Sequence, residues 1–191
     1  MKPPFDDADP EMDAGCVYWV TGLPGAGKST FARALNKSLR EAGKPALLID
    51  SDEVRTALGD VFGFDRESRR QLGAAYGRLA NLFGKQGLDI VCATTSLFED
   101  VRRWNREHLP RYREIYIKTP ANLIVSRHPR GLYARALEKR VRNVPGVDQY
   151  IEEPRAPDVV IDNADGVTPG DLIAIAAHIA MERREKDHPS G

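Results

Sequence analysis

The stretch Gly22-Leu23-Pro24-Gly25-Ala26-Gly27-Lys28-Ser29 fits the phosphate-loop pattern G-x-x-x-x-G-K-[ST] at all of its fixed positions. The run Cys16-Val17-Tyr18-Trp19-Val20-Thr21 before it is apolar and β-branched, which indicates a buried strand. Apolar side chains then recur at helical spacing up to Gly43, a residue type that ends helices. Strand, glycine loop and helix form the context that this pattern needs. The sequence therefore predicts a nucleoside triphosphate site.

The residue types of this loop suit the binding of ATP. Glycines let backbone N–H groups turn inward around a phosphate, and the following helix adds partial positive charge at its N-terminus. We expect Lys28 to reach the β- and γ-phosphates and the Ser29 hydroxyl to ligate Mg²⁺. The predicted ATP-binding residues of the loop are Gly22, Gly25, Ala26, Gly27, Lys28, Ser29 and Thr30.

Length and charge limit the class of protein. A chain of 191 residues suits one α/β domain. The 28 basic and 28 acidic side chains balance, which argues against binding of a nucleic-acid polymer. The segment from Arg102 to Arg142 is nevertheless basic, with twelve Lys or Arg against three acidic residues. It suits a small anionic substrate, and a solvated basic face is the alternative interpretation.

The sequence favours a cytoplasmic protein that does not enter a membrane. Cys16 and Cys92 both lie in apolar runs, which predicts buried free thiols in a reducing compartment. The first residues are rich in Pro and Asp and lack the apolar core of a signal peptide. No apolar run approaches the ~18 residues of a membrane span.

Strands and helices are expected to alternate along the chain. Further strands are predicted at 45–50, 89–95, 113–119 and 159–162, and helices at 66–86, 98–109, 122–127 and from 168 onward. This alternation predicts a five-stranded parallel sheet covered by helices on both faces, the P-loop NTPase fold. We expect residues 15–181 to form one domain, with a disordered arm at 1–14, a basic flap at about 141–157 and a charged tail at 182–191.

Polar residues follow two of the predicted strands. Asp50 and Asp52 come directly after the second strand, where open α/β sheets bind ligands. Either carboxylate would hold Mg²⁺ through water or take a proton from an attacking hydroxyl. Asp52 with Arg55 would also start a short helix, and the two roles are compatible. Ser96 lies at the tip of the third strand.

The chain lacks the marks of two large classes of nucleotide-binding protein. There is no Asn-Lys-x-Asp pattern for guanine, as a GTPase would need. The third strand ends in Thr and Ser rather than in the acid of a motor or transporter ATPase. Small size, acids after the second strand and a basic flap favour a small-molecule kinase, in which positioning and positive charge drive phosphoryl transfer.

From about Trp19 to Asp162 the chain resembles the adenylyl-sulfate kinase family. The resemblance is carried by the glycine loop, by D-S-D-E-V-R at 50–55, by G-F at 63–64 with Arg69, by P-R-G-L-Y at 129–133 and by V-P-G-V-D at 144–148. It implies transfer of the ATP γ-phosphate to the 3′-hydroxyl of a nucleotide, with Mg²⁺, by a homodimer.

The resemblance also implies roles for individual residues. Asp50 or Asp52 would orient Mg²⁺ and the hydroxyl, and Ser29 with Asp50 would serve the metal. Lys28, Asp50, Asp52 and Ser96 would form the catalytic set. Arg127 would lie near the base of ATP. The acceptor would be bound by Asp52, Arg55, Phe64, Arg69, Ser96, Leu97, Arg142 and Val144, with Phe64 stacking on its base and Arg142 closing from the flap.

The departures from the family pattern fall on the acceptor side. Leu72 replaces an Asn, Val144 replaces a Phe that would sandwich the adenine, and Leu97 and Glu99 replace Pro and Arg. Three stretches, A-T-T-S-L-F at 93–98, W-N-R-E at 104–107 and V-P-G-V-D at 144–148, also resemble a branch that contains cytidine diphosphoramidate kinases of capsule and surface-polysaccharide pathways. Adenylyl sulfate and cytidine diphosphoramidate are therefore both candidate acceptors. The sequence also leaves open a non-catalytic nucleotide-binding regulator and a kinase of gluconate or shikimate.

Overall fold

The computed structural model describes residues 14–59, 61–128, 131–164 and 166–187, with side chains up to 182. Nearly all of the predicted N-terminal arm and the last four residues of the predicted tail lie outside this description. The last helix, α7 (Pro169–Asp187), continues past residue 181. The part of the predicted charged tail that the structure describes is therefore helical.

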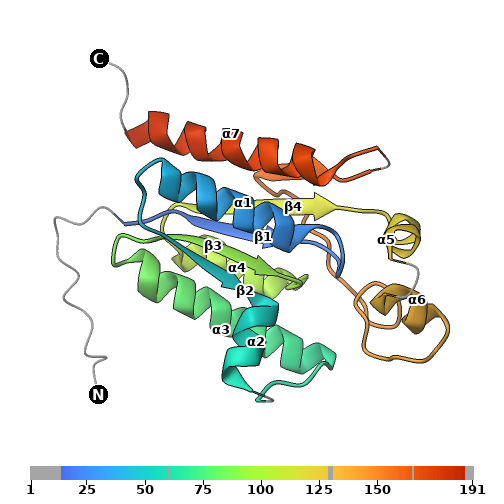
Figure 1. Cartoon of the computed structure of the whole chain (residues 1–191). Helices are drawn as coiled ribbons and strands as arrows, with labels where there is room; N and C mark the ends of the chain where they lie inside the picture. The colour runs from blue at the N-terminus through green and yellow to red at the C-terminus, as the bar shows by residue number, and fades with distance from the viewer. Residues whose placement is uncertain (1–13, 60, 129–130, 165, 188–191) are drawn as a thin grey trace, which may run out of the picture.

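The core of the molecule is a parallel sheet, as predicted (Figure 1). Its strands are β1 (Val17–Thr21), β2 (Ala46–Asp50), β3 (Asp89–Thr94), β4 (Tyr112–Lys118) and β5 (Val159–Asp162). They lie in the order β2-β3-β1-β4-β5, with β1 paired to both β3 and β4. The strand that leads into the glycine loop is thus central in the sheet.

Helices cover both faces of the sheet (Figure 1). On one face α1 (Lys28–Glu41) packs against α7, and their core includes Tyr18 and Val20 of β1. On the other face lie α3 (Arg66–Gly84) and α4 (Glu99–His108), with Val17 and Trp19 beneath them. The alternation of inward side chains along β1 therefore serves two separate cores. The shorter helices are α2 (Ser51–Leu58), α5 (Ala121–Arg127) and α6 (Leu132–Leu137), toward the carboxyl end of the strands.

The predicted apolar stripe of α3, formed by Leu72, Ala75, Tyr76, Leu79, Leu82 and Phe83, is confirmed in large part. Leu72 and Tyr76 are buried, and Leu79 and Phe83 pack against the same core, but Leu82 is 39% exposed. The prediction did not include the buried glycines of this face: a Cβ on Gly73 would lie 2.3 Å from Ser96 Oγ, and one on Gly77 would lie 2.4 Å from Asn105 Oδ1. The glycines let α4 and the chain before it approach α3 closely, so this face depends on lack of bulk as well as on hydrophobicity.

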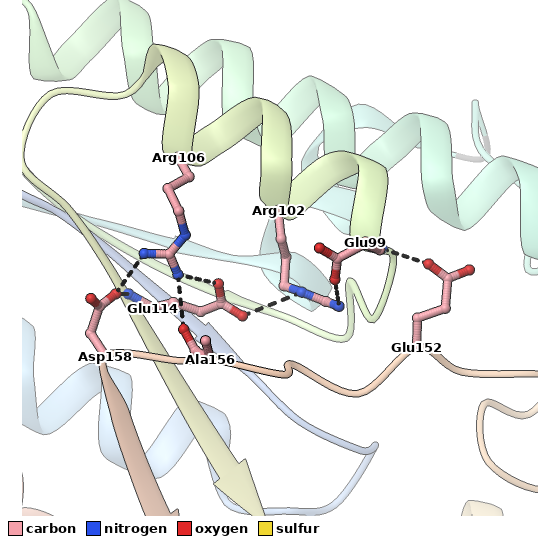
Figure 2. Close-up of polar contacts among 7 residues, drawn as sticks. All are labelled: Glu99, Arg102, Arg106, Glu114, Glu152, Ala156 and Asp158. Carbon is pink, nitrogen blue, oxygen red and sulfur yellow. Dashed lines mark hydrogen bonds and ion pairs between the residues drawn. The ribbon is translucent and has the colours of Figure 1, made fainter.

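The basic segment does not form one surface for an anionic substrate. Arg102 of α4 is buried and pairs with Glu99 and Glu114, and Arg106 pairs with Glu114 and Asp158 (Figure 2). Several positive charges of this segment are thus neutralised within the fold. A count of Lys and Arg along the sequence could not show this, because Arg106 pairs with Asp158, which lies 52 positions away in the sequence.

Two further expectations can be compared with the described residues. Cys16 and Cys92 are buried and are not joined in a disulfide, as predicted, and burial raises the pKa of the Cys92 thiol. Within the described ranges, the helices fall short of the length and apolarity that crossing a bilayer requires.

Candidate functional site

The glycine loop links β1 to α1 and depends on backbone conformations that favour glycine. Gly22 and Gly27 have φ angles of 153° and 93°. A Cβ on Gly22 would lie 2.4 Å from the carbonyl oxygen of Ile117, so the loop passes too close to β4 for a side chain there. Gly27 is the N-cap of α1 and has no side chain to cap the first amides. Free amides at a helix N-terminus are suited to a phosphate.

Lys28 is held inside the loop. Its Nζ donates a 2.8 Å hydrogen bond to the carbonyl oxygen of Leu23. Burial lowers the pKa of Lys28 to about 8, although the nearby carboxylates of Asp52 and Asp50 act in the opposite direction. The ammonium is therefore still largely protonated at neutral pH, and a bound phosphate would favour the charged form further.

A cavity of about 390 Å³ opens beside this loop. Residues of the loop and of α1, α2, α3, the carboxyl end of β3 and the α5–α6 connection line it. They are Pro24, Gly25, Gly27, Lys28, Ser29, Thr30, Ser51, Asp52, Arg55, Phe64, Arg69, Leu72, Tyr76, Ala93, Thr94, Thr95, His128 and Leu132. The phosphate loop and the predicted acceptor residues Asp52, Arg55, Phe64 and Arg69 thus share one cavity.

The two predicted acids occupy different environments. Asp50 is only 2% exposed, and its Oδ1 accepts from the Asp52 backbone N–H at 3.1 Å, which caps α2. Its Oδ2 has no hydrogen-bond partner and lies 3.6 Å from Arg33. Asp52 is exposed and lines the cavity. Capping was the alternative role foreseen for Asp52, yet Asp50 fulfils it.

The oxygen donors at this edge suit Mg²⁺. The Ser29 side chain lines the cavity, and the buried Asp50 Oδ2 lacks a hydrogen bond. Oxygen ligands are the type that Mg²⁺ takes, and it commonly combines one or two carboxylates with water and substrate phosphates. The described residues contain no group of three or more His, Cys, Asp or Glu that would hold a metal on their own. A Mg²⁺ site here would thus be completed by the nucleotide.

Two guanidinium groups lie close to the ring of Phe64. The ring is 58% exposed, with the Arg55 guanidinium 4.6 Å and the Arg69 guanidinium 5.4 Å from its centroid. Arg55 donates to the carbonyl of Phe62 and Arg69 to that of Phe64, which orients both cations. An exposed aromatic face beside two fixed cations can bind a planar group that carries negative charge.

The predicted flap contacts this aromatic platform. Gln149 Nε2 donates to the Phe64 carbonyl at 3.0 Å, and Arg69 reaches the carbonyl of Asn143 at 3.4 Å. Asp148 accepts hydrogen bonds from the backbone amides of Asn143 and Val144. The segment is therefore a hydrogen-bonded turn beside the cavity, formed without helix or strand.

Several predicted site residues lie outside the cavity lining. Ser96, Leu97 and Val144 are buried, and Val144 belongs to the core beneath α1 and α7 at 1% exposure. Arg142 is exposed. Arg127 donates to Asn163 Oδ1 at 3.1 Å, and Asn163 Nδ2 donates to the Ala26 carbonyl at 3.0 Å. Arg127 is thus connected to the phosphate loop through Asn163, and its predicted contact with the base of ATP stays a prediction.

Sequence reasoning did not include some of the lining residues. Thr94 is the last residue of β3 and Thr95 follows it, and their position at the end of a parallel strand was an available signal. Tyr76 donates from its hydroxyl to the Ser51 carbonyl at 3.1 Å, and His128 is close to Gly25. No local pattern could indicate these two, because the fold alone brings them to the loop.

Known proteins with similar sequences are nucleotide kinases. A model of the adenylylsulphate kinase family matches residues 14–162. The chain is 36% identical over 148 residues to the cytidine diphosphoramidate kinase of Campylobacter jejuni, covering 78% of this chain and 86% of that protein. It is 38% identical over 152 residues to the adenylyl-sulfate kinase of Myxococcus xanthus, covering 78% and 82%.

Solved structures agree with this assignment. The APS kinase of Mycobacterium tuberculosis in complex with AMPPNP and APS superposes with a TM-score of 0.77 at 26% identity, covering 88% of this chain and 98% of that one. A hexameric APS kinase from Thiobacillus denitrificans has a TM-score of 0.63 at 25% identity, covering 89% and 29%. The glycine loop, the shared cavity and these matches lead to one conclusion: the chain is a kinase that belongs to the adenylyl-sulfate kinase family.

Proposed function

We propose that this protein transfers the γ-phosphate of ATP to the 3′-hydroxyl of a nucleotide, with adenylyl sulfate as the acceptor. The observation that carries the proposal is the cavity shared by the phosphate loop and the Arg55–Phe64–Arg69 platform. ATP phosphates on one side and a base with an acidic group on the other would place donor and acceptor next to each other.

The residues that line the cavity suit this reaction. Lys28 would hold the transferred phosphoryl group and balance its developing charge. Asp52 would accept the proton of the attacking hydroxyl, and Arg55 and Arg69 would bind the acceptor's phosphate or sulfate. Ser29 and Asp50 would hold Mg²⁺, which supplies charge neutralisation on the ATP phosphates when bound.

Cytidine diphosphoramidate is a second candidate acceptor, favoured by two positions. Leu72 lines the cavity, so its side chain offers no hydrogen bond to a base. Val144 is buried in the core, so it supplies no second stacking face opposite Phe64. Both features suit a smaller pyrimidine with weaker demands on the pocket. The relative from Campylobacter jejuni named for this activity adds support.

A coupled ATP-turnover assay distinguishes the two acceptors. Purified protein with Mg²⁺ is offered adenylyl sulfate or cytidine diphosphoramidate, and kcat/KM is compared. Higher kcat/KM with adenylyl sulfate supports a sulfate-activation enzyme. Higher kcat/KM with the cytidine compound assigns the protein to polysaccharide modification. ATP consumption that is independent of both nucleotides would reject the proposed function. Omission of Mg²⁺ from the same assay tests the metal requirement.

The resemblance to the family further supports a homodimer that works in the cytoplasm. The hexameric relative from Thiobacillus denitrificans shows that assembly varies among similar proteins. Light scattering after size-exclusion chromatography measures the mass directly. A mass near 42 kDa, twice the 21.2 kDa of the chain, supports the dimer, and a mass near 21.2 kDa contradicts it.

A further inference from the structure

Glu152 joins three segments that are far apart in the sequence. Its Oε1 accepts from Arg66 Nη2 at 2.5 Å, and its Oε2 accepts from the Glu99 backbone N–H at 2.7 Å. Its own backbone N–H donates to the Leu97 carbonyl at 3.0 Å. The side chain of Glu152 is 29% exposed. One carboxylate thus ties the flap segment to the starts of both α3 and α4.

The contact with α4 supplies a missing helix cap. Phe98 is the N-cap residue of α4 and has no side-chain oxygen to satisfy the first amides. Glu152 provides that acceptor from a different part of the chain, as Figure 2 shows. A carboxylate at a helix N-terminus also interacts favourably with the helix dipole. The loop before α4, which begins at the cavity residue Thr95 directly after Thr94 of β3, is therefore held by Glu152.

The contact with α3 lies one helical turn from an acceptor-side residue. Arg69 follows Arg66 by three positions, and its guanidinium lines the cavity beside Phe64. Leu72 and Tyr76 continue the same helix along the cavity wall. Because helices move as rigid units, a shift at Arg66 would move this wall. Arg66 is further restrained by the Phe98 ring, whose centroid is 5.1 Å from its guanidinium.

The chain after Glu152 is anchored to α4 and β4 (Figure 2). Asp158 accepts from the Glu114 backbone N–H at 2.7 Å and pairs with Arg106, which also reaches the Ala156 carbonyl. Glu114 in turn pairs with both Arg106 and the buried Arg102. These contacts hold the chain that follows Glu152 in place. The hydrogen bonds that the Glu152 carboxylate accepts from Arg66 and from the Glu99 amide can therefore fix the position of α3 relative to α4.

We propose that Glu152 is a positioning residue that fixes the spacing between the two walls of the acceptor side, Arg69 with Phe64 on one and Thr94–Thr95 on the other. The inference rests on the proposed transfer to a nucleotide acceptor. Glu152 makes no described contact with the phosphate loop or α1. Its loss should therefore weaken acceptor binding and leave ATP binding nearly unchanged.

Steady-state kinetics of Glu152→Ala, Arg66→Ala and the double variant test this proposal. We expect Arg66→Ala, which removes one charge-assisted hydrogen bond, to raise KM for the acceptor about tenfold, with KM for ATP changed less than about twofold. Glu152→Ala also removes the acceptor for the Glu99 amide, so it should raise KM for the acceptor at least as much. The double variant should be no worse than Glu152→Ala, because that variant already loses the link to Arg66. Glu152→Gln keeps an acceptor for the Glu99 amide, so it should fall between wild type and Glu152→Ala.

A matched control removes an ion pair of similar exposure on a different part of the fold. Glu182→Ala removes the 2.9 Å pair between Arg113 of β4 and Glu182 of α7, and it should leave both KM values unchanged. Unfolding temperatures are measured for every variant. Should Glu152→Ala fail to fold, Glu152→Gln and Arg66→Ala carry the comparison.

The outcomes separate this inference from the proposed function. Wild-type turnover with unchanged acceptor KM in the Glu152 and Arg66 variants would overturn the positioning role alone, as would an equal rise in KM for ATP. Wild-type protein that turns over neither nucleotide would reject the proposed function. Calorimetric titration of wild type and variants with adenylyl sulfate and with cytidine diphosphoramidate then still tests the positioning role. That role predicts that the variants bind the nucleotide about tenfold more weakly than wild type does.

Discussion

At the scale of single residues, Lys28 links the sequence pattern to the chemistry. It is the fixed lysine of the loop, it is buried, and its Nζ is oriented by the Leu23 carbonyl. Its identity and place were predictable because the pattern is local. Its lowered pKa was not predictable, since it arises from burial, whose effect exceeds the opposing effect of the Asp50 and Asp52 carboxylates.

Removal of the Lys28 ammonium should abolish most of the turnover. We expect Lys28→Ala to lower kcat by about 10³-fold, because the charge acts on the phosphoryl group in the transition state. Stopped assays with saturating ATP and acceptor measure this, with circular dichroism to confirm folding. Activity within about tenfold of wild type would contradict the assigned role of the loop. Exposed Lys37 of α1, changed to Ala, is a matched control that should keep full activity.

The lowered pKa of Lys28 also predicts a pH dependence. In the free protein the ammonium loses its proton as the pH rises through about 8, so the charge that attracts ATP is lost above that pH. We expect kcat/KM for ATP to fall on the alkaline side with a midpoint near pH 8. The decline in kcat should begin at higher pH, because bound phosphate raises the pKa of Lys28. In Lys28→Arg the alkaline decline should disappear. A constant kcat/KM up to pH 9.5 in wild type would contradict the account.

At the scale of elements, the packing of α3 against α4 departs most from what the sequence predicted. Hydrophobic periodicity located the helix and most of its buried stripe, including Leu72 and Tyr76, but it also included the exposed Leu82. Glycines are absent from hydrophobicity patterns, so the close approach at Gly73 and Gly77 could not be foreseen. The same limit applies to Glu152, whose partners are 53 and 86 positions away.

Substitution of Gly77 tests the close packing of these helices. A Cβ at this position would meet Asn105 Oδ1 at 2.4 Å and the Trp104 ring at 3.3 Å. We expect Gly77→Ala to lower the free energy of unfolding by about 1–3 kcal/mol through overpacking, partly offset by better helix propensity. Urea denaturation measures the change. Arg78→Ala, on the exposed side of the same helix, should stay within about 0.5 kcal/mol of wild type. Equal stability of Gly77→Ala and wild type would show that the helices can separate at no cost.

At the scale of the whole molecule, the sheet order gathers the site at one end of the parallel strands. No single segment of the sequence predicts the order of the strands in the sheet. The alternation of strands and helices and the position of the glycine loop nevertheless predicted that the site lies at the carboxyl edge of the sheet. Thr94, Thr95, Tyr76 and His128 reach the cavity only through that topology. In the proposed function, the acceptor would be selected by side chains such as Leu72, and this choice was not predictable because the effect of such a side chain depends on the bound molecule.

The most direct test of the central claim is identification of the product. The protein is incubated with ATP, Mg²⁺ and either adenylyl sulfate or cytidine diphosphoramidate, with Lys28→Ala as the blank, and the mixture is followed by ³¹P NMR. The account predicts ADP together with a new phosphomonoester resonance coupled to the ribose H3′ proton of one acceptor. ATP that stays intact with both nucleotides, or γ-phosphate released only as inorganic phosphate, would contradict it.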